Sequence, residues 1–118
     1  MKIVSMDKVK SEPVVAPLFT GEVSRQPLAR DSRDLNVSIV NFPKGVRNQW
    51  HSHESDQVLI VTAGKGIVAT DGEQREVVVG DVVVIPAGEK HWHGATNDSA
   101  FSHITIQRTG STTKQLES

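Results

Sequence analysis

The sequence predicts an all-β domain in which short strands form a sandwich or a barrel. Glycine and proline interrupt the chain often, and the segments between them are rich in valine, which favours strands. No segment of useful length has the apolar spacing of a helix. The 118 residues are sufficient for a single domain with one hydrophobic core.

The expected strands follow from the alternation of apolar and polar residues and from the turn residues between them. They lie at residues 19–28, 35–42, 57–63, 67–70, 76–79, 82–85, 91–95 and 102–107. Gly64-Lys65-Gly66 is interpreted as a turn that ends one of these strands, and Asp71-Gly72 as a hairpin turn. Residues 19–108 are therefore expected to form the barrel.

Two terminal segments are expected to lie outside the barrel. Residues 1–18 are predicted to form an extended arm or an edge segment, because Pro13 and Pro17 lack the backbone N–H that regular strand pairing needs. Residues 109–118 are polar and are expected to form a flexible tail.

Two valine-rich segments, residues 77–79 and 82–85, are apolar at every position. A strand with one face in water alternates apolar and polar residues, so these segments are expected to be covered on both faces. A second sheet would cover one face, and a terminal segment or a partner chain would cover the other. We therefore expect a homodimer.

The composition limits the classes of function. There are 13 basic and 14 acidic residues, so no basic excess favours binding to nucleic acid or to a membrane surface. Because cysteine is absent, disulfides and thiolate chemistry are excluded. No run approaches the ~18 apolar residues of a membrane span, and the N-terminal apolar stretch is too short for a signal peptide. We expect a soluble, cytoplasmic protein that binds a small molecule.

The candidate chemistry lies in the histidines, all five of which fall between residues 51 and 103. Four of them form two pairs separated by one residue, His51 with His53 and His91 with His93. Residues i and i+2 of a strand point to the same side, so each pair sends two imidazoles into one space. Gln57, whose amide oxygen can coordinate a metal, opens the next strand. A metal site is the interpretation that we favour, and histidines that only pack in the core are the alternative.

The charge of such a site would be unusual. Imidazole and amide ligands are neutral, so a divalent ion held by three imidazoles and an amide would keep its full positive charge. The ion would act as a Lewis acid and would favour an anion, such as an enolate or cyanide, in its open positions.

Two longer motifs carry a resemblance to a known family. The first motif consists of Gly45, five residues, His51-x-His53, three residues, Gln57, six residues and Gly64. The second consists of Gly80, five residues, Pro86-x-Gly88, two residues and His91. Both spacings closely resemble the two motifs of the cupins, and the chain is similar to a small single-domain cupin of the conserved-barrel (cupin_2) type.

This resemblance implies a cupin double-stranded β-helix, also called a jelly-roll barrel, in a single domain. It also implies one divalent metal ion per chain. The ligands that it assigns are His51, His53, Gln57 and His91. The chain departs from the family at two positions, since Gln57 stands where glutamate is usual and Ala95 where asparagine often closes the second motif. The first departure puts the usual carboxylate chemistry in doubt.

A narrower similarity covers residues 19–107. Residues 50–64 and 86–95, with shorter stretches at 19–23 and 103–107, look like the bacterial cupins with hydroxynitrile lyase activity. Those cupins are manganese-dependent and cleave or form cyanohydrins. The similarity implies an Mn(II) site, with Fe(II), Ni(II) or Zn(II) as alternatives, and it implies that His103 is the catalytic base.

Strand parity suggests which other side chains lie near the metal. His103 shares a strand face with Gln107, and its alternative role is a core histidine bonded to backbone. His93, on the face of His91, is expected in the pocket, where it would coordinate the metal or bind another pocket group. Ser38 and Val40 are expected to line the same pocket. Trp50 and Trp92 have the opposite parity and are expected on the other face or at an interface.

Three functions remain open from the sequence. The first is an enzyme that cleaves a cyanohydrin C–C bond, with the metal as Lewis acid. The second is an iron- or manganese-dependent dioxygenase that acts on a phenolic or enolic substrate. The third is a non-catalytic cupin that binds a metal or a small ligand.

Overall fold

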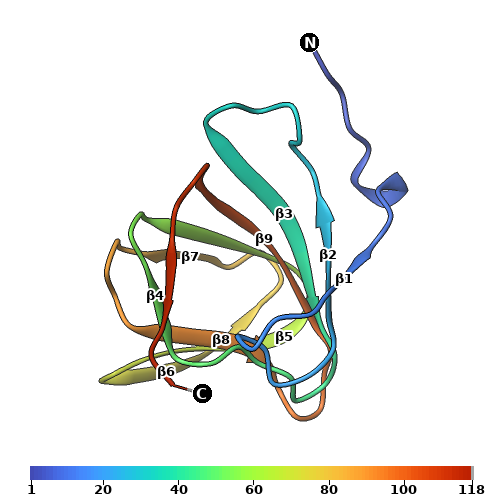
Figure 1. Ribbon diagram of the computed structural model, residues 1–118. Coiled ribbons are helices and arrows are strands. Elements are labelled where there is room, and N and C mark those ends of the chain that lie inside the picture. The colour runs from blue at the N-terminus through green and yellow to red at the C-terminus, as the bar shows by residue number, and fades with distance from the viewer. Residues whose placement is uncertain (118) are drawn as a thin grey trace.

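The chain folds as a small β-barrel in the computed structural model, which describes residues 1–117 (Figure 1). Its strands are β1 (Glu12–Val14), β2 (Val23–Pro27), β3 (Leu35–Phe42), β4 (His51–His53), β5 (Gln57–Thr70), β6 (Glu73–Val78), β7 (Val82–Ile85), β8 (His91–Ala95), β9 (Phe101–Arg108) and β10 (Thr113–Gln115). The only helical element of the described residues is a 3₁₀ turn, η1 (Met6–Lys8). The prediction of an all-β, single-domain jelly roll is confirmed.

The sheet curls into a barrel because β5 takes part in both of its halves. The strand order is β1-β2-β3-β9-β5-β8-β4-β10, and β6 and β7 also pair with β5. Residues 57–64 of β5 pair with β9, whereas residues 66–70 pair with β8. All of these pairings are antiparallel.

The predicted break after residue 63 is wrong, because the chain continues as one strand through Gly64-Lys65-Gly66. A register shift between Val61 and Ala63 and a positive φ of 69° at Gly64 change the direction of the strand without ending it. Such an irregularity bends a strand and increases its local twist. The two glycines therefore mark a corner of the barrel.

The N-terminal arm lies at the edge of the sheet, as expected. β1 pairs only with β2 among the described strands, and the Gln26 side chain donates a hydrogen bond to the Val9 carbonyl over 2.9 Å. Figure 1 shows the first residues extending away from the barrel.

The C-terminal segment differs from its prediction. Residues 113–115, expected to be part of a flexible tail, form β10 and pair with β4. The polar composition of the segment concealed this role, because an edge strand with one wet face needs few apolar residues. Ser118, the last residue of the predicted tail, lies outside the described residues.

The hydrophobic core lies between the two halves of the barrel. Its buried members are Val23, Phe42, Leu59, Val61, Val68, Val77, Ile85, Ala95 and Phe101. Phe42 and Phe101 stack with ring centroids 5.9 Å apart, and Phe42 also contacts the rings of His93 and His103, at 5.8 and 5.6 Å. The Phe101 ring also contacts His103, at 5.4 Å, so two aromatic side chains of the core border the histidines.

The valine-rich strands are covered on one face only within a single chain. Val77 and Ile85 are buried, whereas the side chains of Val82 and Val84 are 60% and 64% exposed. No described segment of the chain covers that outer face. Of the two covers that were expected, a terminal segment is therefore excluded for residues 1–117, and a partner chain is untested. The homodimer stays a prediction. None of the described helices is long and apolar enough to cross a membrane.

Candidate metal centre

A cavity of about 160 Å³ lies inside the barrel, beside the histidines. Its lining residues are Leu18, Phe19, Val40, Phe42, Asn48, His51, His53, Gln57, His93, His103, Thr105, Gln107 and Thr113. One part of the wall is apolar and the other part carries imidazole, amide and hydroxyl groups. The cavity therefore offers both a ligand-binding surface and groups able to coordinate or transfer protons.

The two histidine pairs meet because β4 and β8 are antiparallel neighbours. His51 lies directly opposite His91 in this pairing, and their ring centroids are 4.2 Å apart. His51, His91 and His93 are buried and offer ligand atoms that all lie within 4.8 Å of one another, so these three could hold a metal ion. His53 is not in that group, although its ring centroid lies 4.8 Å from that of His51.

Backbone carbonyls determine which nitrogen of two histidines carries the proton. His51 Nδ1 lies 2.6 Å from the Gln49 carbonyl oxygen, and His91 Nδ1 lies 2.9 Å from that of Glu89. A carbonyl oxygen only accepts, so each Nδ1 is the donor and each neutral ring keeps a lone pair on Nε2. This is the tautomer in which a histidine can bind a metal through Nε2.

His53 and Gln57 complete the arrangement. The Nδ1 atom of His53 lies 2.8 Å from the Thr113 hydroxyl oxygen, and its buried Nε2 atom has no hydrogen-bond partner among the described residues. The Gln57 amide nitrogen donates to the Thr105 hydroxyl over 2.9 Å, and the amide oxygen lies on the side of His91.

Two hydrogen-bond acceptors then face each other. Gln57 Oε1 and His91 Nε2 are 3.2 Å apart, and neither carries a proton in the tautomer that Glu89 imposes on His91. Two lone pairs at this separation repel, and a cation between them would reverse the sign of the interaction. The donor set therefore fits a metal ion.

Burial keeps the histidines neutral. Burial and, after it, repulsion from a protonated His91 lower the pKa of His51 from 6.5 to about 3 and that of His53 to about 4. Burial also lowers the pKa of His91, that of His93 well below its ordinary value, and that of His103 to about 4. Near neutral pH a metal ion would therefore not have to displace ring protons at these sites.

We expect the metal-free protein to lose stability as the pH falls below about 6.5. The folded-state pKa values of His51, His53 and His103 are about 3, 4 and 4, against 6.5 ordinarily. Below pH 6.5 the unfolded chain therefore binds more protons than the folded chain. The free energy of unfolding is highest above pH 6.5 and falls as the pH is lowered towards the folded-state pKa values, by up to about 1.4 kcal/mol per pH unit for each histidine.

The measurement is urea denaturation in the presence of a chelator between about pH 7 and pH 5, where ordinary carboxylates stay ionised. An unfolding free energy that is constant over this range would contradict the neutral, buried state of the histidines.

His93 and His103 form a buried hydrogen-bonded chain with Asn48. The Asn48 oxygen accepts the backbone N–H of His93 over 2.8 Å, so the Asn48 amide nitrogen is the atom that lies 3.2 Å from His93 Nε2. That nitrogen only donates, so His93 Nε2 accepts and His93 Nδ1 carries the proton. His93 Nδ1 in turn lies 3.1 Å from His103 Nε2, which is therefore unprotonated.

These hydrogen bonds bear on whether His93 binds the metal. Both of its ring nitrogens already have partners, whereas His53 Nε2 has none. Coordination by His93 would break one of these hydrogen bonds, although its position satisfies the geometry of the three-histidine group. The donor pattern thus favours His53 over His93 as a ligand.

The other predicted residues are distributed as follows. Val40 and Gln107 line the cavity, as expected from strand parity. Ser38 is buried but is not part of the lining, and its hydroxyl has no partner in the part of the chain that the structure describes. Sequence reasoning missed Asn48 and Thr113, which lie outside the strands that it predicted. No local pattern marks either residue, because each acts on a histidine that is distant along the chain.

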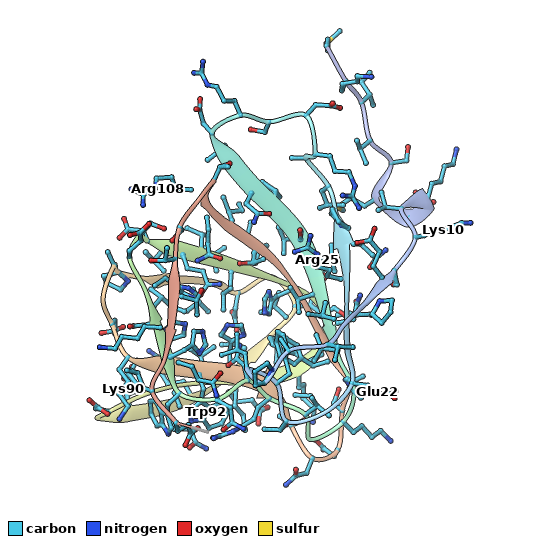
Figure 2. The ribbon with its side chains drawn as sticks, in the orientation of Figure 1. Lys10, Glu22, Arg25, Lys90, Trp92 and Arg108 are labelled. Carbon is cyan, nitrogen blue, oxygen red and sulfur yellow. The ribbon has the colours of Figure 1, made fainter. Side chains whose placement is uncertain are left out.

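The two tryptophans pack against each other on the outer side of the histidine strands. Trp50 and Trp92 make an edge-to-face contact with centroids 6.4 Å apart. The Arg47 guanidinium lies 4.4 Å from the Trp92 ring centroid, and the Lys90 ammonium lies 4.9 Å from that of Trp50. Figure 2 shows Lys90 and Trp92 at the end of the barrel where β8 lies. The predicted parity of both tryptophans is confirmed.

A jelly-roll barrel with a buried cluster of neutral histidines defines a class of small β-barrel proteins with an internal ligand site. Residues 38–106 match the family described as Cupin domain, and the chain belongs to this family. An (R)-mandelonitrile lyase from Granulicella tundricola is 44% identical over 95 residues, which are 78% of this chain and 72% of that protein.

Solved structures agree with this fold. A cupin-like protein from Thermotoga maritima superposes with a TM-score of 0.83 at 38% identity, covering 90% of this chain and 84% of the other. The polyketide cyclase RemF from Streptomyces resistomycificus gives a TM-score of 0.85, covering 100% of this chain and 87% of the other. Its 20% identity supports the fold alone.

Proposed function

We propose that this chain binds one divalent metal ion through His51, His53, Gln57 and His91. The observation that carries the proposal is the pair of acceptors, Gln57 Oε1 and His91 Nε2, that face each other at 3.2 Å. The buried, unpartnered Nε2 of His53 supports it, because a buried polar atom without a partner is costly.

Mn(II) is the metal that we favour, with Fe(II), Ni(II) and Zn(II) as alternatives. Three imidazoles and one amide oxygen do not select among these ions. The affinities of such a site follow the Irving–Williams order of divalent metals whatever the protein, so metal availability also decides which ion is bound. A bound ion would supply Lewis acidity, which lowers the pKa of a hydroxyl group that it binds.

For the reaction we propose hydroxynitrile lyase-like cleavage of a small cyanohydrin. The similarity to a relative named as (R)-mandelonitrile lyase supports this choice. The cavity of about 160 Å³ supports it too, since an apolar cavity of about 150 Å³ accommodates benzene. Phe19, Val40 and Phe42 provide an apolar wall for the organic part of such a substrate.

His103 is the proposed proton acceptor. Asn48 and His93 fix the tautomer in which its Nε2 atom is unprotonated. The substrate hydroxyl takes the place of the His93 Nδ1–H at this nitrogen and gives it its proton. The substrate oxygen then forms the C=O bond of the aldehyde or ketone, and the bond to the nitrile carbon breaks. The electron pair leaves with cyanide, which recovers the proton as HCN.

The test compares the purified protein, the chelator-stripped protein and the same sample reconstituted with Mn(II). Metal content is measured by mass spectrometry, and cleavage of mandelonitrile by the absorbance of the released benzaldehyde. We expect near-stoichiometric metal, loss of cleavage on stripping and its recovery with Mn(II). Failure to take up any divalent metal would refute the metal site.

Metal uptake without cleavage would refute the lyase reaction and leave the metal site standing. Oxygen consumption with a phenolic or enolic substrate would then identify the dioxygenase alternative. Binding of small ligands without any turnover would identify a non-catalytic cupin.

A further inference from the structure

The C-terminal strand is the main backbone partner of the short strand that carries His51 and His53. β10 pairs with all three residues of β4, with Thr113 opposite His53 and Gln115 opposite His51. On its other side, β4 pairs with β8 only at His51 and His91. Because β4 has only one residue pair with β8, its position depends mainly on its pairing with β10.

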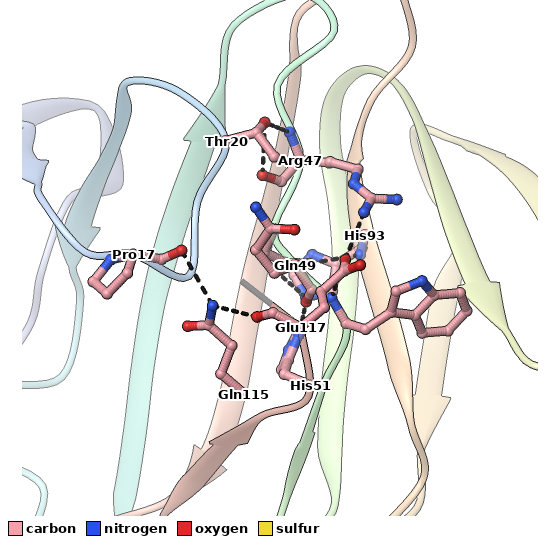
Figure 3. Close-up of polar contacts among 10 residues, drawn as sticks. Pro17, Thr20, Arg47, Gln49, His51, His93, Gln115 and Glu117 are labelled. Carbon is pink, nitrogen blue, oxygen red and sulfur yellow. Dashed lines mark hydrogen bonds and ion pairs between the residues drawn. The ribbon is translucent and has the colours of Figure 1, made fainter.

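The residues after β10 form hydrogen bonds with the segment just before His51. The Glu117 carboxylate accepts hydrogen bonds from the Arg47 guanidinium over 2.7 Å and from the Trp50 backbone N–H over 2.8 Å (Figure 3). The Leu116 N–H donates to the Trp50 carbonyl over 2.8 Å. The C-terminal segment thus holds β4 at both of its ends.

Thr113 also contacts the candidate centre with its side chain. Its hydroxyl oxygen lies 2.8 Å from His53 Nδ1, and the residue lines the cavity. If the hydroxyl donated to Nδ1, the proton of His53 would be on Nε2, as a buried donor without a partner. If the hydroxyl accepts, Nε2 keeps its lone pair, which is the state of His53 that can bind a metal ion.

We propose that the C-terminal strand is part of the metal centre, with Thr113 as the positioning residue that orients His53 and accepts its Nδ1 proton when Nε2 binds the metal. This inference rests on the proposed metal site. Partners of this kind change metal affinity by roughly 10- to 100-fold when they are removed. Valine matches the shape of threonine but has no hydroxyl, so Thr113→Val isolates this contribution.

The experiment measures the dissociation constant of Mn(II) for the wild-type protein, Thr113→Val, Thr113→Ser and Lys114→Ala. Lys114 is exposed on the same strand and serves as the matched control. We expect Thr113→Val to weaken Mn(II) binding roughly 10- to 100-fold, and Thr113→Ser and Lys114→Ala to bind as the wild type does. If the valine variant does not fold, Thr113→Ala is measured in its place.

Melting temperatures of the metal-free proteins separate positioning from a general loss of stability. A purely structural role would lower the melting temperature of Thr113→Val and leave the Mn(II) affinity of the folded protein unchanged, which would overturn the inference. Equal weakening by Lys114→Ala would also overturn it. Absence of Mn(II) binding by the wild type would refute the proposed metal site itself, so the two failures are distinguishable.

Discussion

Replacing His103 by glutamine or alanine is expected to lower the turnover of mandelonitrile roughly 10²- to 10⁴-fold, the usual contribution of a positioned base. Metal content should not change, because His103 is not among the proposed ligands. Glutamine retains a polar side chain in the cavity but cannot accept the proton, so it separates the loss of the base from the loss of volume.

The structural reason is the isolation of His103 from other bases. It is fully buried on β9, and within residues 1–117 its ring contacts His93, whose two ring nitrogens are both occupied. The pKa of about 4 keeps His103 unprotonated, and therefore able to accept a proton, at neutral pH. A bound dication would lower this pKa further, so acid should stop the wild-type reaction only below about that value.

The measurement is kcat for each variant after metal loading, with Ile104→Val as the control. Ile104 is the neighbour of His103 on the other face of β9 and lines no part of the cavity. Turnover that persists in both His103 variants would assign the proton transfer to another group and refute the proposed role.

Much of the candidate site could be predicted because it depends on strand parity. His51 and His53 face one space since alternate residues of a strand share a side, and the sequence shows this spacing directly. His91 joins them through the pairing of β4 with β8, and before the structure only the resemblance to the cupins implied that it would. Gln57 is the first residue of β5, the strand that follows β4 along the chain, and its side-chain amide reaches the same space.

The partners that orient these histidines could not be predicted. Thr113 lies opposite His53 only because β10 returns to pair with β4, and Asn48 contacts His93 across 45 residues of chain. Neither contact has a local pattern, since tertiary pairing alone brings the residues together. The orientation of each ring, and hence the nitrogen that carries its proton, was therefore hidden from sequence reasoning.

The course of β5 was mispredicted for a related reason. Two glycines within three residues usually end a strand, and the local pattern favoured a turn. In the structure, Gly64 lies opposite Phe101 of β9, and its neighbour Lys65 lies opposite Val78 of β6, so pairing continues across the corner. Tertiary pairing on both sides overrides the local preference.

Gly64→Ala is therefore expected to prevent folding or to destabilise the protein severely. The residue has a φ of +69°, and a Cβ atom built there would lie 1.8 Å from the carbonyl oxygen of Ala100. That atom belongs to the backbone of a neighbouring segment and cannot move aside as a flexible side chain could. A non-glycine residue in this conformation is strained even without the clash.

The corner also sets the geometry of the candidate site. Gln57 lies on the half of β5 before Gly64, whereas Thr70, the partner of His91 in the β5–β8 pairing, lies after it. A shift of β5 at this corner that relieves the clash would change the separation of Gln57 from His91. A Gly64→Ala protein that still folds should therefore bind Mn(II) more weakly than the wild type.

Gly72→Ala is the matched control, because a Cβ atom at Gly72 has no neighbour within 4 Å and its φ is not positive. Soluble yield, the urea midpoint and the Mn(II) dissociation constant are measured for both variants. Gly72→Ala should match the wild type in all three. Wild-type stability in Gly64→Ala would mean that β5 does not pass this corner in the described conformation, and the joint placement of Gln57 and His91 would then lose its structural basis.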